Sequence, residues 1–158
     1  MEQRGDAAVK RKELWALGIG VLVSVGLPVN GYAGENGTRC TLDTLRGQYL
    51  VAANGTLFPP AFGVTEPSVS AAAGYSIYNG NGTGTDWVTF TVNGVNQNVA
   101  SPTPTTYTLK SDCTGTKTVL PFGPHFNIFV AFDGDALTAI ATDPGFAVSE
   151  SDKRTGSE

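Results

Sequence analysis

The 158-residue sequence contains little charge and few residues suited to binding metals. Lys, Arg, Asp and Glu together make up 15% of the chain, which has two cysteines, one methionine and one histidine. A single histidine and two distant cysteines form a poor ligand set, so we expect no metal site and no cofactor. The sequence also contains no phosphate-binding loop, nucleotide motif or internal repeat of fixed period. Helical periodicity is almost missing as well, which argues against a helical domain.

Long apolar runs are also scarce. Leu14 to Leu27 is uncharged and apolar, but it is shorter than the roughly 20 residues that a membrane-spanning helix needs. It follows the basic segment 4–12 and precedes small and turn-forming residues at 28–33. This order is typical of a secretory signal peptide over residues 1–33, with cleavage between Ala33 and Gly34. An uncleaved membrane anchor is the alternative. We therefore expect export to the periplasm or the cell exterior.

Positive charge is scarce in the part that export would leave. Residues 34–158 contain six Lys and Arg against eleven Asp and Glu, which leaves a net charge of −5. Such a surface does not attract phosphate backbones or anionic lipids. We therefore expect neither nucleic acid nor, after signal cleavage, a membrane as partner.

The two cysteines, Cys40 and Cys113, are predicted to form a disulfide, since an even pair in an exported protein is typically oxidised. The bond would close a loop of more than seventy residues, for which chain entropy gives roughly 4 kcal/mol. A metal site or a catalytic thiol is the rival interpretation, but no nearby base singles out either cysteine as a nucleophile.

The clearest local pattern is a β-hairpin over residues 71–94. Asn79-Gly80-Asn81-Gly82 provides residues that accept positive φ between two runs rich in aromatic, β-branched and Thr residues. With a two- or four-residue loop, one apolar face would be shared by a set of residues from both strands: Ala73, Tyr75, Ile77, Val88, Phe90 and Val92. The other face would carry Ser76, Tyr78 and Trp87.

The rest of the chain indicates seven to nine short strands separated by Asn, Asp, Gly and Pro. A first strand over 47–53 is expected to stop at Asn54-Gly55, and a last one to cover 146–150. The proline-rich segment 57–67 is either a loop packed over the core or a lid over a cavity. A β-sandwich and a barrel both fit, and short connections favour an up-and-down antiparallel barrel of about eight strands over residues 34–154. Residues 155–158 are expected to be a disordered tail.

Several turn motifs resemble a family of small exported bacterial proteins. The matching segments are Leu45-Arg46-Gly47-Gln48-Tyr49, Asn79 to Gly84, Asp112-Cys113-Thr114-Gly115-Thr116, His125-Phe126 and Thr142-Asp143-Pro144-Gly145. The resemblance spans about Cys40 to Arg154 and implies a lipocalin-like barrel of the allene oxide cyclase type. It concerns turns and strand starts, so it implies architecture and carries no catalytic residue over to this chain.

A barrel of this size is either filled by side chains or holds one small ligand. We predict an interior that binds a hydrophobic or aromatic small molecule. The expected ligand-contacting residues are apolar or carry one hydroxyl: Tyr49, Tyr75, Ile77, Val88, Phe90, Tyr107, Phe126 and Ile128.

Two titratable residues are candidates for chemistry. Asp86 shares the apolar face of the hairpin and would act as a proton donor or acceptor if the protein were a cofactor-free isomerase or cyclase; a solvated or backbone-capping carboxylate is the alternative. His125, the only histidine, is expected at the rim with a structural hydrogen bond rather than as a general base. In a third interpretation, the protein is a structural module that forms homo-oligomers through exposed Trp87 and Tyr78.

Overall fold

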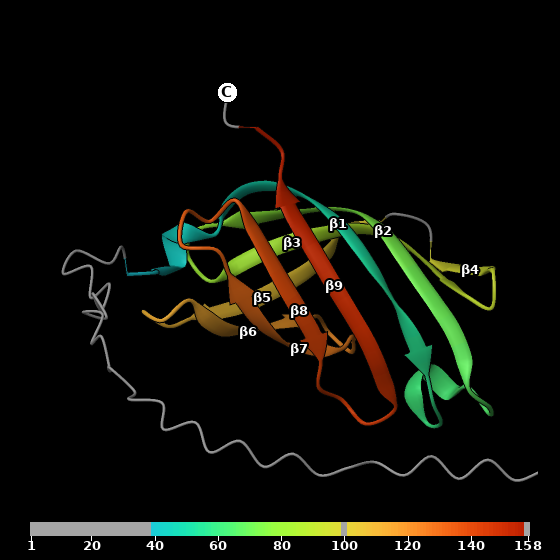
Figure 1. Ribbon diagram of the computed structural model, residues 1–158. Helices are drawn as coiled ribbons and strands as arrows, with labels where there is room; N and C mark the ends of the chain where they lie inside the picture. Colours follow the sequence, from blue (N-terminus) through green and yellow to red (C-terminus); the bar gives the residue numbers. More distant parts are fainter. Residues whose placement is uncertain (1–38, 99–100, 157–158) are drawn as a thin grey trace, which may run out of the picture. The chain divides into compact units, whose positions relative to one another are not determined.

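The fold is an antiparallel barrel of eight strands with one additional strand (Figure 1). The computed structural model describes residues 39–98 and 101–156. Their elements follow in chain order: η1 (Leu42–Thr44), β1 (Arg46–Leu57), η2 (Ala61–Gly63), β2 (Ser68–Asn79), β3 (Thr83–Val92), β4 (Val95–Asn98), β5 (Thr103–Leu109), β6 (Thr114–Val119), β7 (His125–Val130), β8 (Ala136–Ala141) and β9 (Phe146–Arg154). The predicted signal peptide and its cleavage site lie outside the described residues.

Closure of the sheet decides between the two predicted architectures. Each strand from β5 to β9 pairs with the next, β9 pairs with β1, and β1 with β2. Pairing of β2 with β3 and of β3 with β5 completes the ring, so the barrel prediction is confirmed over the sandwich. The extra strand β4 pairs with the end of β3, at Phe90–Val92, whereas β5 pairs with its beginning, at Thr83–Asp86.

The hairpin prediction is confirmed, but its assignment of faces is wrong. β2 ends at Asn79 and β3 begins at Thr83, so the loop contains three residues, Gly80 to Gly82, instead of two or four. The side chain of Asn81 accepts hydrogen bonds from the backbone N–H and the hydroxyl of Thr83 within this loop. An odd loop length reverses the parity of β2 relative to β3.

Reversed parity moves two predicted ligand residues to the outer face. Tyr75 now lies beside Trp87, with the rings stacked at 5.9 Å between centroids, and Ile77 is exposed. Ser76 and Tyr78, expected outside, are buried. The predicted surface patch of Trp87 with Tyr78 is therefore wrong, and the aromatic neighbour of Trp87 is Tyr75.

Two strands are longer than expected. β1 continues through Asn54 and Gly55 to Leu57, because Gly55 lets the backbone of Ala147 on β9 approach to within a distance that any Cβ would block. β9 continues to Arg154, and the backbone N–H of Thr155 still donates to the carbonyl of Gln48. Turn residues inside a strand thus mark a close approach here rather than a strand end.

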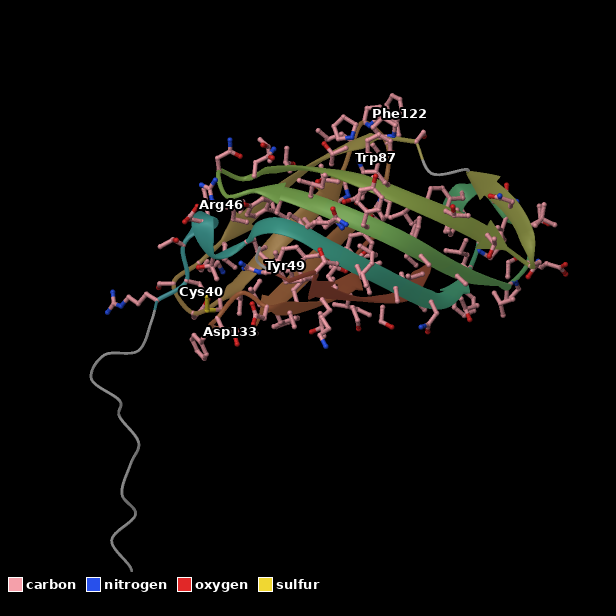
Figure 2. The ribbon with its side chains drawn as sticks, turned by 90° about the horizontal axis from the view of Figure 1, so that it is seen from above. Cys40, Arg46, Tyr49, Trp87, Phe122 and Asp133 are labelled. Atoms are coloured by element: carbon pink, nitrogen blue, oxygen red, sulfur yellow. A yellow bond between two sulfur atoms is a disulfide. The ribbon has the colours of Figure 1, made fainter. Side chains whose placement is uncertain are left out.

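One end of the barrel is closed by a packed core, which we call the closed half. Leu45, Tyr49, Tyr78 and Tyr107 are buried there, and Tyr78 meets the other two tyrosine rings edge to face at 5.2 and 5.4 Å. The predicted disulfide between Cys40 and Cys113 is confirmed and ties the segment before η1 to the β5–β6 turn, as Figure 2 shows near Cys40.

All three buried tyrosine hydroxyls in the closed half have partners. Tyr49 donates to the carbonyl of Gly134 at 2.5 Å, and Tyr107 contacts the carbonyls of Leu42 and Leu45 at 2.9 Å each. Tyr78 donates to Asp152 at 3.0 Å. Burial raises the pKa of Tyr49 and Tyr107 and raises that of Tyr78 well above the usual value, so all three stay neutral hydroxyls.

Candidate functional site

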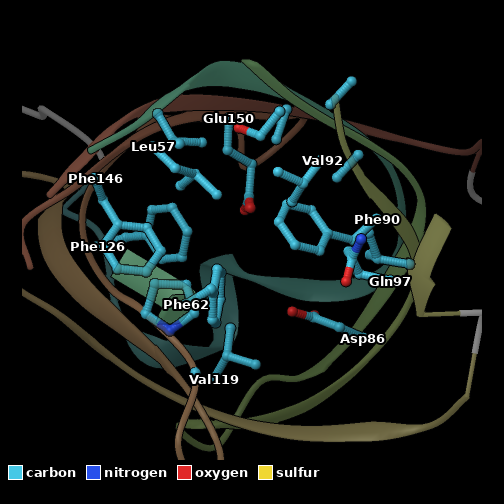
Figure 3. Close-up of a pocket in the computed structure, with 18 of the residues that line it drawn as sticks. Leu57, Phe62, Asp86, Phe90, Val92, Gln97, Val119, Phe126, Phe146 and Glu150 are labelled. Carbon is cyan, nitrogen blue, oxygen red and sulfur yellow. The ribbon is translucent and has the colours of Figure 1, made fainter. Parts of the chain in front are cut away.

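The other end of the barrel, which we call the open half, contains a cavity of about 610 Å³ (Figure 3). Its wall comes from most of β3, the late parts of β1 and β6, the early parts of β2, β5, β7 and β9, β4, the η2 loop and the loop between β6 and β7. The apolar side chains of that wall are Leu57, Phe62, Val88, Phe90, Val92, Val119, Phe126, Phe146 and Val148.

Small residues on the inner face of β2 leave this space open. Ser70 and Ala72 line the cavity, and Ala53 on the neighbouring strand β1 lines it as well. Gly74 follows Ala72 on the same face, and its missing side chain allows the backbone of Trp87 on β3 to approach closely. The first large inward side chain of β2 is Tyr78, which belongs to the closed half. Strand β2 is therefore the reason that the two halves differ.

The η2 loop lies at the cavity and contributes Phe62, which is 54% exposed. Its ring contacts Phe90 at 5.4 Å and Phe146 at 4.9 Å between centroids. Phe62 has a φ of 45°, a left-handed conformation that costs a non-glycine residue of order 1 kcal/mol. The proline-rich segment thus places an aromatic side chain over the cavity, in a conformation that the packing has to hold.

Polar groups converge where the cavity meets the closed half. Asp86 on β3 and Glu150 on β9 both line the cavity and are 6% and 7% exposed (Figure 3). Lys117 on β6 lies behind them, fully buried, with its Nζ atom 2.8 Å from Glu150 Oε1 and 3.1 Å from Asp86 Oδ2. The other oxygen of Asp86 accepts a hydrogen bond from Ser76 at 2.6 Å.

The charge of Lys117 is maintained by its neighbours. Burial alone would lower the pKa of this ammonium, but Glu150, Tyr78 and Asp86 around it raise the pKa well above its usual value. The ammonium also lies 5.7 Å from the centre of the Tyr78 ring, on its face. Lys117 is therefore a permanent cation that fixes two carboxylates from different strands.

Asp152 extends the polar cluster toward the closed half. Burial, together with the negative charge of Glu150, raises the pKa of Asp152 to about 8. One of its oxygens accepts from Tyr78, while Oδ1 is buried with no hydrogen-bond partner among the described residues. Near neutral pH this carboxyl is mainly protonated, so Asp86 and Glu150 are the two groups of the cluster that form ion pairs with Lys117.

The predicted site residues fall into three groups. Asp86, Val88, Phe90 and Phe126 lie on the cavity wall. Tyr49, Tyr107 and Ile128 face the interior but pack into the core without lining the cavity. Tyr75 and Ile77 lie outside, so their predicted inward orientation is wrong.

His125 has the rim position expected of it. Its side chain is exposed, its Nδ1 lies 2.9 Å from Asp143 Oδ1, and its backbone N–H donates to the other oxygen of that carboxylate. The backbone hydrogen bond lowers the pKa of Asp143. This pair fixes the turn before β9.

Sequence reasoning missed Ser76, Lys117, Glu150 and Asp152. The sequence contained a signal for three of them, because residues two apart in a strand lie on the same face. Lys117 shares the inward face of β6 with Val119, and Glu150 and Asp152 share that of β9 with Phe146 and Val148. Charged residues at inward positions of a strand are rarely buried without partners.

Residues 39–98 and 101–156 contain neither a group of metal-ligating side chains nor a membrane-spanning helix. No group of three His, Cys, Asp or Glu residues in them has the arrangement of a metal site. None of the helices in those ranges has the length and apolar character required to cross a membrane.

The barrel is compatible with the lipocalin-like barrels that the turn motifs resemble. Its eight strands enclose both a packed core and a cavity, as barrels of this size can. Comparison of the chain with protein-family models, with curated proteins and with solved structures gives no match.

Proposed function

We propose that this chain is an exported binding protein that holds a hydrophobic or aromatic small molecule inside its barrel. The observation that carries the proposal is the cavity, whose volume of about 610 Å³ lies within the roughly 300–1,000 Å³ typical of ligand sites. Its wall combines many apolar side chains with the two carboxylates of Asp86 and Glu150, which is the usual composition of a small-molecule site.

The signal peptide that the sequence predicts over residues 1–33 supports the same proposal. The predicted signal peptide would deliver the chain to an oxidising compartment, where the Cys40–Cys113 disulfide is stable. Because a barrel of about eight strands can hold one small ligand, the exported domain itself would carry the ligand outside the cytoplasm. We expect the mature protein in the periplasm or the surrounding medium.

The first test is native mass spectrometry of protein purified from its own host. A retained compound that is released on denaturation would support the proposal. In parallel, the apolar fluorophore N-phenyl-1-naphthylamine is titrated into the purified protein. We expect one bound probe per chain and an emission shift to shorter wavelength, because the probe leaves water for an apolar wall.

Ala72→Phe fills the cavity and should abolish probe binding. Its matched control is Ala73→Phe, the same change at the next residue of β2, which lies on the exposed outer face and off the cavity wall. Equal binding of the probe by both variants would contradict a site inside the barrel, and so would saturation at several probes per chain.

A cofactor-free isomerase or cyclase is the second candidate, favoured by the position of Asp86. This carboxylate lies on the wall, where it would reach a bound substrate. A binding protein returns the recovered host compound unchanged, whereas an isomerase converts it to a product of equal mass. If conversion occurs, Asp86→Asn should stop it and leave apolar probe binding in place.

A further inference from the structure

The charges of the polar cluster do not balance. Lys117 provides one positive charge, while Asp86, Glu150 and Asp152 provide three carboxyl groups. Even without Asp152, two carboxyl groups, those of Asp86 and Glu150, share the single ammonium of Lys117. Arg154 does not supply a second positive charge, because it is engaged in the closed half, where it donates to Tyr49 and to the carbonyls of Thr44 and Gly134.

The arrangement of the cluster presents its negative side to the cavity. Asp86 and Glu150 line the cavity, whereas the ammonium of Lys117 has an exposed side-chain fraction of 0% and is not part of the wall. A molecule in the cavity therefore meets carboxylate oxygens, with the compensating cation behind them. An anionic head group, such as that of a fatty acid, would have to approach these oxygens without reaching Lys117.

Glu150 also has unused hydrogen-bonding capacity. Its Oε1 atom accepts from Lys117, but its Oε2 atom accepts no hydrogen bond from any described residue. The residue is only 7% exposed, and its carboxylate points into the cavity in Figure 3. Because Glu150 lies on the cavity wall, this oxygen can accept a hydrogen bond from a donor on a molecule that enters the cavity.

We infer that the cavity binds an amphipathic cation, in which an ammonium group contacts Glu150 and Asp86 and an aromatic or branched apolar body fills the space beyond. An ammonium group brings the missing positive charge and N–H donors for the unused oxygen. The apolar body would pack against the phenylalanine rings at 62, 90, 126 and 146. This inference rests on the proposed function, because it specifies the chemical class of the ligand.

The test compares three ligands that share one ring system and differ in the head group. They are 2-(1-naphthyl)ethylamine, 2-(1-naphthyl)ethanol and 1-naphthylacetate, titrated separately into the mature protein at pH 7 by isothermal calorimetry. We expect the amine to bind about tenfold more tightly than the alcohol, and the carboxylate to bind most weakly. This ranking is measured on the unaltered protein and needs no variant to fold.

Glu150→Gln assigns the effect to the cavity carboxylate. The variant keeps the Asp86–Lys117 pair and should bring the affinity for the amine to within about threefold of that for the alcohol, while the affinity for the alcohol stays the same. Glu66→Gln is the matched control, because it removes the same charge from an exposed loop position. Where Glu150→Gln folds poorly, Asp86→Asn takes its place.

The outcomes separate the two proposals. An alcohol or a carboxylate that binds as tightly as the amine overturns the cation inference and leaves a binding cavity. An amine preference that Glu66→Gln reduces as much as Glu150→Gln also overturns it, since the preference would then come from net charge. If none of the three ligands binds, and the neutral fluorophore does not bind either, the proposed function itself is wrong.

Discussion

The two halves of the barrel interior are built from different side chains. In the closed half, three tyrosines, Leu45 and a disulfide fill the space, and every tyrosine hydroxyl has a partner. In the open half, the inner face of β2 carries Ser70 and Ala72, and a cavity takes the place of a core. One strand, β2, passes through both halves and changes from small residues to Tyr78 between them.

The comparison separates residues that hold the barrel together from residues that shape its empty space. Burial of large side chains stabilises the closed half, where each truncation would leave a void. In the open half, the wall already borders a void, so truncation there removes fewer contacts. The Asp86–Lys117–Glu150 cluster lies at the boundary and belongs to both, since it faces the cavity and is buried like a core.

The largest effect is expected at this boundary. Lys117→Met removes the cation that Asp86 and Glu150 share and leaves both buried carboxyl groups without their ion-pair partner, which should lower the free energy of unfolding by about 3–5 kcal/mol. Urea unfolding monitored by fluorescence measures it. Lys110→Met, the same change at an exposed position, should stay within about 0.5 kcal/mol of the wild type.

The triple variant Lys117→Met, Asp86→Asn and Glu150→Gln should recover part of that loss, because it removes the unpaired charges together with the cation. Equal stability of the single and the triple variant would show that packing of the lysine stem, rather than its charge, is what the boundary requires.

Loss of the disulfide should come next in size and should leave the cavity of the open half unchanged. Cys40 and Cys113 are 73 residues apart in sequence, so replacing both by Ala should cost about 2–4 kcal/mol through the greater entropy of the unfolded chain. Thermal unfolding measures the loss. Binding of N-phenyl-1-naphthylamine at 25 °C should stay the same, and a weakened affinity would contradict the separation of the two halves.

Alternation and turn residues were enough to predict the barrel, because strand number and short connections limit the topology strongly. They did not predict the faces of the hairpin, since the loop has an odd number of residues, Gly80 to Gly82, and the sequence Asn79-Gly80-Asn81-Gly82 does not show where the strands end. The charged cluster was harder still. Asp86, Lys117 and Glu150 come from three strands far apart in the sequence, and only the closed barrel brings their side chains to one point.

A smaller effect is expected from the pH dependence of stability. The pKa of Asp152 is about 8 in the folded protein, above its usual value of 3.8, so the folded state binds the additional proton between these limits. The contribution of Asp152 to the free energy of unfolding should therefore be fully present below pH 4 and be lost as pH rises toward 8, by at most ~1.4 kcal/mol per pH unit. Urea unfolding from pH 5 to 8.5 measures the slope.

Asp152→Asn should flatten this slope, because an amide replaces the protonated carboxyl and does not titrate. Asp112→Asn is the control, since Asp112 is exposed and hydrogen bonds from Thr114 lower its pKa, which places its titration below the measured range. A slope that persists in Asp152→Asn would assign the pH dependence to another group of the cluster.

The smallest change in stability is expected at Phe62, in the open half. Phe62→Ala loses the contacts with Phe90 and Phe146, but the ring is more than half exposed, so its free energy of unfolding should differ from the wild type by less than about 1 kcal/mol. The effect on binding should be larger. Because the ring lies over the cavity, its removal should speed both association and dissociation of N-phenyl-1-naphthylamine in stopped-flow measurements. Phe122→Ala, a change at a 92% exposed phenylalanine off the cavity wall, should alter neither rate.

If Phe62→Ala instead destabilised the protein as much as a core truncation, about 3–5 kcal/mol, the η2 loop would belong to the core and the open half would be closed by it.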